Sequence, residues 1–272
     1  MPSACLRVEP NQVRATVLEM LYRAGASHLG PCMSVVDILV ALYGAVDVEA
    51  IRQGRPDRSR IIVSKGHCAA AVYAVMHHYG LLSADALADY CREGSLLAGH
   101  VSHAVKGVEH STGALGHGLP VACGCAIGLR SRGDEGSRVF CVMGDGELQE
   151  GSVWEALMFA RHHRLRNLVP LVDNNRISSI TATDRVIDLQ PLENRFAGFG
   201  FEPYVVDGHD VEAIQEALES IERRGEPGVV ICNTVKGRGV PFAENEPIWH
   251  YRSLGEEQFR AALAALAEAM RQ

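Results

Sequence analysis

The sequence predicts an α/β fold in which a mostly parallel central sheet is covered by helices on both faces. The first observation is alternation, because short runs rich in β-branched residues are separated by stretches with helical apolar spacing. The second is composition: 272 residues with 47% hydrophobic and 22% charged residues are typical of a globular protein with a sizeable core. Repeated strand–helix–strand order indicates a parallel sheet. No repeat, low-complexity tract or long linker interrupts this order, so we expect a single domain over residues 1–272.

The expected elements alternate along the chain after a helical beginning. Residues 11–24 have helical apolar spacing, and residues 33–43 repeat it, with Ser34 placed as an N-cap. Strands are then expected at 60–63, 138–143, 168–172, 203–206 and 229–235. Helical patterns between and after these strands cover 67–79, 119–130, 150–165, 210–224 and, with an Ala/Leu stripe, 255–270.

Charge and composition argue against several classes of function. Lys and Arg total 26 against 33 Asp and Glu, and the formal net charge of −7 disfavours nucleic acid and anionic membranes as partners. The N-terminus MPSACLRVEP lacks a signal-peptide pattern, and no stretch approaches the length of about 18 apolar residues that a membrane helix needs. The eight cysteines lack CxxC spacing and are expected to be reduced, buried thiols. We therefore expect a cytoplasmic protein with no membrane and no nucleic-acid partner.

Polar side chains follow two of the expected strands. The sequence GDG comes directly after one strand, at 144–146, and DNN follows the next, at 173–175. Ligands of open parallel sheets bind beyond the carboxyl ends of the strands, so both segments should face one crevice. The glycines would let the backbone turn and approach a ligand, and the free N–H groups of the helix beginning near Glu150 favour an anion. Asp145 and Asn175 are hard oxygen donors suited to Mg²⁺, so the pattern predicts a metal-bridged diphosphate. Because Asp145 lies in a loop, we expect it to contribute little to packing.

This pattern resembles the thiamine diphosphate signature, in which GDG is followed some thirty residues later by NN. Further stretches are similar, in order and context, to the N-terminal domain of the transketolase family: SHLGPCMS (27–34), SKGH (64–67), GH (99–100), STGALGHGLP (111–120), GDGELQEG (144–151), DNNRIS (173–178) and KGRGVPFAENEPIWH (236–250). The resemblance extends from about residue 12 to residue 250. It implies the thiamine-diphosphate-binding fold, with thiamine diphosphate and Mg²⁺ as cofactors.

The resemblance also implies roles for individual residues. Asp145 and Asn175 would hold the metal through their side chains, and Ile177 through its carbonyl oxygen. Residues expected to bind the cofactor are His67, Gly116, Gly144, Asp145, Gly146, Glu147, Asn175, Ile177 and His250. The catalytic residues implied are His28 and His100, which would contact the donor sugar, together with His250 and Glu150. Glu150 would bond across a subunit interface to the glutamate that activates the cofactor.

Some residues are left without a role or depart from the family pattern. Histidines on helical patterns, such as His77 and His162, are expected to be structural or solvated. Lys65 could be either a structural residue behind the site or a surface charge. His117 stands where the family more often has glutamine, and Val101 where proline is usual, which leaves the sugar preference open.

A complete transketolase continues into a pyrimidine-binding domain that supplies the activating glutamate, whereas this sequence ends at Gln272. We therefore expect the N-terminal subunit of a split transketolase, which transfers a two-carbon ketol unit from a ketose to an aldose. It would act only with a complementary C-terminal, pyrimidine-domain subunit, in two copies of each chain, on a sugar or sugar phosphate. The alternatives are an alpha-type subunit of a 2-oxoacid dehydrogenase, a specialised thiamine-dependent carboligase, and a non-catalytic binding or regulatory relic.

Overall fold

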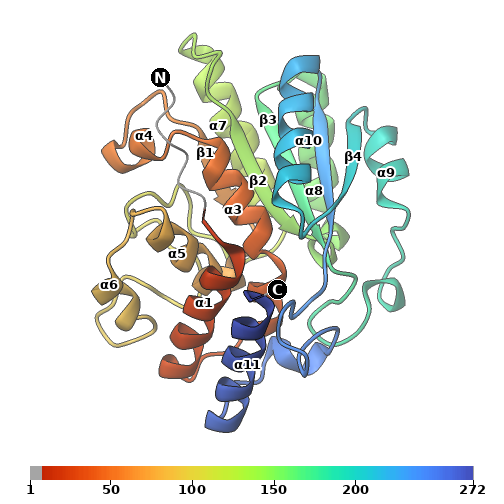
Figure 1. Cartoon of the computed structure of the whole chain (residues 1–272). Helices are drawn as coiled ribbons and strands as arrows, with labels where there is room; N and C mark the ends of the chain where they lie inside the picture. Colours follow the sequence, from red (N-terminus) through yellow and green to blue (C-terminus); the bar gives the residue numbers. More distant parts are fainter. Residues whose placement is uncertain (1–7, 272) are drawn as a thin grey trace.

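The computed structural model describes residues 8–271, and its centre is a parallel sheet (Figure 1). The strands are arranged in the order β1-β2-β3-β5-β4, and every neighbouring pair is parallel. Their bounds are β1 (Arg60–Val63), β2 (Val139–Gly144), β3 (Leu168–Asn174), β4 (Glu202–Asp207) and β5 (Gly228–Asn233). This sheet confirms the predicted α/β class and the position of each expected strand.

Helices cover both faces of the sheet. Successive residues of a strand point to opposite sides, so one strand contributes side chains to two buried clusters. In β2, Phe140 and Val142 belong to one buried cluster, whereas Cys141 and Met143 belong to the other. The first cluster includes residues of α1 (Pro10–Ala24), α3 (Val36–Ala45), α5 (Ala69–His78) and α10 (Val211–Arg224). The second includes residues of α7 (Gly118–Ser131), α8 (Gly151–His162) and α9 (Leu192–Gly198). The last helix, α11 (Glu256–Ala269), packs on α1 (Figure 1).

Short helices and 3₁₀ turns occupy the connections: α2 (Leu29–Ser34), α4 (Val48–Gln53), α6 (Ala84–Ala88), η1 (Gly66–Cys68), η2 (Gly146–Gln149), η3 (Thr183–Arg185) and η4 (Pro247–His250). The helix expected over 33–43 is present as α3 but begins at Val36, and residues 33–34 belong to the end of α2. Ser34 ends α2 instead of capping α3, and its hydroxyl donates to Asp173 Oδ2 at 2.6 Å. Helices α4, α6 and α9 were not expected, because five to seven residues are too few for a periodic pattern.

The carboxyl ends of the strands meet at one edge of the sheet. Gly144 at the end of β2 is paired with Asp173 of β3, and Asn174 of β3 with Asn233 of β5. The backbone N–H of Ser64, which follows β1, donates to the carbonyl oxygen of Val142 at 2.8 Å. The loops after β1, β2, β3 and β5 are therefore neighbours at this edge.

The described cysteines are free, as expected. Most are buried, and Cys125 is half-buried. Cys91 is exposed, so the expectation of burial is wrong at this position, while Cys5 lies outside the described residues. No helix in residues 8–271 has both the length and the apolar character needed to cross a bilayer.

Candidate active site

A cavity of about 600 Å³ lies at this edge of the sheet, where the four loops meet. The residues expected at the site line it with the exception of Gly116: His28, His67, His100, Gly144, Asp145, Gly146, Glu147, Glu150, Asn175, Ile177 and His250. The structure therefore brings together side chains that are far apart in the sequence.

The three expected metal ligands lie around the turn that follows β3. Oδ2 of Asp145 accepts a hydrogen bond from the backbone N–H of Arg176 at 2.7 Å, and Oδ1 accepts from Gly146 at 2.9 Å. Asn175 is buried, and its Oδ1 accepts from the N–H of Ile177 at 3.1 Å. Arg176 has a left-handed φ of 64°, which turns the chain sharply between Asn175 and Ile177. The expectation that Asp145 contributes little to packing is wrong, because the residue is 5% exposed and its side chain links the end of β2 to the turn after β3.

The chemistry of this donor set fits Mg²⁺. Burial raises the pKa of Asp145 to about 6, and the negative charge of Asp173 adds to the rise. A cation beside Asp145 would offset the free-energy cost of burying its negative charge. A carboxylate, an amide oxygen and a carbonyl oxygen are ligands that Mg²⁺ accepts. Within the described residues, no three His, Cys, Asp or Glu side chains are grouped to hold a metal ion. A metal here would therefore depend on the oxygens of Asn175 and Ile177 as well as on Asp145.

The glycines of the GDG segment are not required by the backbone conformation. Neither Gly144 nor Gly146 has a left-handed φ, so the expectation that they permit the turn is wrong. A Cβ atom at Gly144 would meet nothing within 4 Å, and one at Gly146 would be 3.7 Å from the nearest atom, in Thr183. Both glycines line the cavity, so the free space next to them is available to a ligand.

Glu147 links the GDG segment to Gly116 through hydrogen bonds. Oε1 of Glu147 accepts from the N–H of Gly116 at 2.8 Å and from the Ser64 hydroxyl, and Oε2 accepts from Gly144 at 3.3 Å. Burial raises the pKa of Glu147, and these hydrogen bonds oppose the rise. Gly116 has a φ of 78°, and a Cβ atom there would lie 2.6 Å from Glu150 Cβ. A side chain at this position would therefore clash with Glu150, which explains the glycine by packing.

Four histidines from separate segments meet inside the cavity. The ring centroid of His28 lies 5.6 Å from that of His67, 5.5 Å from His100 and 5.3 Å from His250. The rings of His67 and His250 are 5.1 Å apart. His28 has a left-handed φ of 73°, and its backbone N–H donates to the His250 carbonyl oxygen at 3.0 Å.

Burial makes three of these imidazoles poor bases. It lowers the pKa of His28 to about 4, with His100 contributing, and that of His250 to about 3, with Lys236 contributing. The pKa of His67 lies well below its usual value, because of burial and then the charge of Lys65. These rings are neutral at pH 7, so each can accept a hydrogen bond at one nitrogen and donate one from the other.

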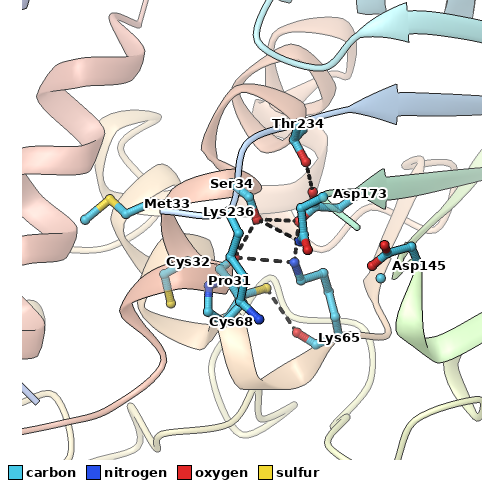
Figure 2. A network of polar contacts seen from close by, with 12 residues as sticks. Pro31, Cys32, Met33, Ser34, Lys65, Cys68, Asp145, Asp173, Thr234 and Lys236 are labelled. Carbon is cyan, nitrogen blue, oxygen red and sulfur yellow. Dashed lines mark hydrogen bonds and ion pairs between the residues drawn. The ribbon is translucent and has the colours of Figure 1, made fainter. Parts of the chain in front are cut away.

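Lys65, which the sequence left without a role, is buried in an ion pair with Asp173 (Figure 2). The hydroxyl groups of Ser34 and Thr234 also donate to this carboxylate, and Lys65 Nζ donates to the Pro31 carbonyl oxygen at 3.3 Å. Burial alone would lower the pKa of Lys65, but the charge of Asp173 raises it above its usual value. Burial would likewise raise the pKa of Asp173, but Lys65 holds it below its usual range. The pair is therefore ionised, and its contacts tie together α2, the end of β3 and the segments that follow β1 and β5.

Lys236 is a second buried lysine, and the sequence did not single it out. It lines the cavity, and its Nζ donates to the carbonyl oxygens of Ile177 at 3.1 Å and Ser178 at 2.6 Å. The same nitrogen lies 3.3 Å from His250 Nδ1. Burial lowers the pKa of Lys236 to about 8, and Lys65 adds to the effect. Its place in the KGRG stretch was visible in the sequence, but its burial and its contacts were not.

Glu150, His117 and Val101 lie at the rim of the cavity or outside it. Glu150 is exposed at the rim, at the start of α8. His117 is exposed, and its Nδ1 is 2.8 Å from the Leu115 carbonyl oxygen, whereas Val101 is 3% exposed. Neither His117 nor Val101, the two departures from the family pattern, lines the cavity.

Comparisons with known proteins agree with this fold and identify the family. The family model described as "Transketolase, thiamine diphosphate binding domain" matches residues 7–268. A subunit of the apulose-4-phosphate transketolase of Actinobacillus succinogenes is 38% identical over 243 residues, which are 89% of this chain and 88% of that protein. The 6-deoxy-6-sulfo-D-fructose transketolase subunit SqwG of Clostridium sp. is 33% identical over 264 residues, which are 96% of each chain.

Among solved structures, a transketolase from Campylobacter jejuni superimposes with a TM-score of 0.87 at 28% identity. The match covers 98% of this chain but 43% of that one, so the chain spans less than half the length of this relative. Fold and site thus define a thiamine diphosphate-binding domain. The chain belongs to the transketolase family.

Proposed function

We propose that this chain is the diphosphate-binding subunit of a two-chain transketolase, with residues 1–272 forming one domain. The reaction would break the C2–C3 bond of a ketose and join the released two-carbon ketol unit to the aldehyde carbon of an aldose. The observation that carries the proposal is one cavity that combines the oxygen donors Asp145 and Asn175 with four histidines. A diphosphate site alone would not need this cluster.

The end of the cavity near Asp145 would hold the cofactor's diphosphate. Mg²⁺ would be bound by Asp145, Asn175 and the carbonyl oxygen of Ile177, and Gly146 would offer its backbone N–H to a phosphate oxygen. Lys236 supports the diphosphate assignment, because a buried ammonium group that lines the cavity favours an anionic ligand. Its Nζ now donates to the Ile177 carbonyl oxygen and would release that oxygen to the metal. When bound, thiamine diphosphate supplies the nucleophilic carbon that carries the two-carbon unit between the two sugars.

The histidines would serve proton transfer to and from the sugars. Cleaving the donor requires a base that removes the proton of the C3 hydroxyl, and forming the product requires an acid that returns a proton to the new hydroxyl. Exposed His100 is our candidate for these proton transfers, and neutral His28, whose ring centroid lies 5.5 Å away, would orient the sugar through hydrogen bonds. His67 and His250 would line the diphosphate side, since His250 contacts Lys236.

A separate chain would complete the site. The relatives that are named as transketolase subunits match this chain over most of their own length, whereas single-chain transketolases are longer. Three side chains that line the cavity are apolar or aromatic and exposed, namely Ile180 (74%), Val186 (49%) and Tyr251 (60%). A pyrimidine-domain chain that covers them would supply the activating glutamate, and Glu150 at the rim could reach it. We expect two copies of each chain, in the cytoplasm, where the thiols stay reduced.

The experiment is ketol transfer from a ketose to an aldose by this chain, by the proposed partner and by their mixture. Turnover by the mixture alone is expected. Decarboxylation of a 2-oxo acid instead would identify the alpha-type dehydrogenase subunit. Transfer from a donor other than a ketose would identify a specialised carboligase, and no binding of thiamine diphosphate by the mixture would identify a non-catalytic relic.

A further inference from the structure

A buried polar cluster lies outside the cavity and has no part in the site described so far. It consists of Arg14 on α1, Asp37 on α3 and His209, which precedes α10. His209 Nδ1 lies 2.7 Å from Asp37 Oδ2, and the Arg14 guanidinium donates to the same oxygen. Arg14 and Asp37 are 3% and 2% exposed, and the three residues line a second cavity of about 770 Å³.

The second ring nitrogen of His209 faces the backbone. The N–H of Val235 donates to His209 Nε2 at 2.8 Å. Nε2 must then be the unprotonated nitrogen, and the ring proton lies on Nδ1, where it is donated to Asp37. His209 is thus a neutral bridge from a buried carboxylate to one peptide group, just after the end of β5.

A glycine allows this close contact. A Cβ atom at Gly208 would lie 2.4 Å from Thr234 Cγ2 and 2.9 Å from Cys232 Cβ. The N–H of Gly208 donates to the Asn233 carbonyl oxygen at 2.8 Å. The segment that carries His209 therefore lies directly against the chain that leaves β5.

Val235 is followed by Lys236, whose side chain has little freedom. A Cβ atom at Gly30 would lie 3.1 Å from Lys236 Cγ, so the lysine stem runs over that glycine. The Gly30 carbonyl oxygen accepts from Gly237 at 3.0 Å, which fixes the backbone on the other side of Lys236. The direction of the chain at Val235 therefore decides whether Nζ reaches the carbonyl oxygens of Ile177 and Ser178.

We propose that His209 is a positioning residue of the active site, which orients Lys236 through the peptide N–H of Val235. Asp37 and Arg14 hold the ring in the tautomer that makes this contact possible. This inference rests on the proposed function, because it takes Lys236 to act on the cofactor's diphosphate.

Two amide substitutions separate the two contacts of His209. The side-chain amide of asparagine reaches the place of Nδ1, and that of glutamine the place of Nε2. His209→Asn keeps a donor for Asp37 and loses the acceptor for Val235, whereas His209→Gln does the reverse. Titration of each assembled enzyme with thiamine diphosphate and Mg²⁺ should show a Kd raised about three- to tenfold by His209→Asn, the effect of one lost hydrogen bond, and near wild type for His209→Gln.

A double-mutant cycle with Lys236→Met tests whether His209 affects cofactor binding through Lys236. If His209 acts through Lys236, His209→Asn should add nothing to the Kd of the Lys236→Met enzyme. An undiminished effect in that background, or equal losses with asparagine and glutamine, would overturn the proposal. Wild-type enzyme that binds no thiamine diphosphate would overturn the proposed function instead.

A measurement on the wild-type protein does not depend on the variants folding. Nitrogen NMR should show His209 protonated at Nδ1 only, and hydrogen exchange should show a protected Val235 amide. A ring protonated at Nε2, or a Val235 amide that exchanges freely, would contradict the contact itself.

Discussion

The carboxylate of Asp145 and the backbone N–H of Arg176 are joined by a hydrogen bond of 2.7 Å, which links the end of β2 to the turn after β3. One side chain therefore shapes the cavity wall and is also the only carboxylate in the proposed metal site. A substitution that removes the whole side chain would mix these two roles. An amide can keep the oxygen that Arg176 needs, and it removes the charge together with the hydrogen bond that Gly146 donates to the other oxygen.

Asp145→Asn should weaken binding of thiamine diphosphate and Mg²⁺ by a factor of about ten or more, while the domain stays folded. A neutral amide is a weaker ligand of Mg²⁺ than a carboxylate, so the metal and the diphosphate that it bridges should bind less tightly. Calorimetric titration of the assembled enzyme measures the affinity, and Asp85→Asn on the exposed face of α6 is the matched control. Unchanged affinity with Asp145→Asn would remove this residue from the metal site.

The histidines should separate by role. His100→Ala should reduce turnover about 10²- to 10⁴-fold, the usual effect of losing a positioned proton-transfer group, with little change in cofactor affinity. His28→Ala should do the same, whereas His67→Ala should mainly weaken cofactor binding. Steady-state kinetics and cofactor titration measure the two effects.

His103→Ala is the control for this series. His103 is exposed on the same loop as His100 and does not line the cavity. It should leave turnover near wild type. Wild-type kinetics for both His28→Ala and His100→Ala would show that neither ring acts on the sugar.

Breaking the ion pair of Lys65 and Asp173 should destabilise the fold. Lys65→Met leaves a buried carboxylate without its cation, which typically costs about 3–5 kcal/mol in the free energy of unfolding. The double variant Lys65→Met/Asp173→Asn should lose less than the sum of the single variants, because neither charge is then left alone. Urea unfolding measures these differences.

An exposed ion pair gives the comparison. Arg223 and Glu219 on α10 lie 3.2 Å apart, with side chains 63% and 69% exposed. Arg223→Met should change the free energy of unfolding by less than about 1 kcal/mol. If Lys65→Met costs no more than Arg223→Met, the buried pair does not hold the loops around the cavity together.

Much of the fold could be predicted because the strands are apolar and continuous. The runs ending at Gly144 and Asn174 are buried on both faces, so the sequence shows them clearly. The position of β5 between β3 and β4 could not be predicted, since strand pairing depends on contacts between distant residues. Helices α4 and α6 were missed because they are too short to show periodicity.

The candidate site, like the fold, could be predicted from the sequence only in part. The motif residues Asp145 and Asn175 were found, because their spacing after two strands carries the signal. Lys65 and Lys236 lie in quoted motifs, but a sequence does not distinguish a buried lysine from a solvated one. His209 carried no signal at all, because its contacts with Asp37 and Val235 arise from tertiary packing.

The last prediction concerns Glu150 and the partner chain. If Glu150 shares a proton with the activating glutamate of the partner, Glu150→Gln should lower turnover about ten- to a hundredfold, because an amide can donate to that carboxylate but cannot pass it a proton. Assembly should persist, because one exposed side chain at the cavity rim is a small part of an interface that buries well over 1,000 Å² in typical stable complexes. Sedimentation counts the chains, and ketol transfer measures the turnover. Glu155→Gln is the control, since Glu155 is exposed on the same helix and does not line the cavity. Equal turnover of the Glu150→Gln and Glu155→Gln enzymes would remove Glu150 from the interface, and full transfer by this chain alone would mean that no partner completes the site.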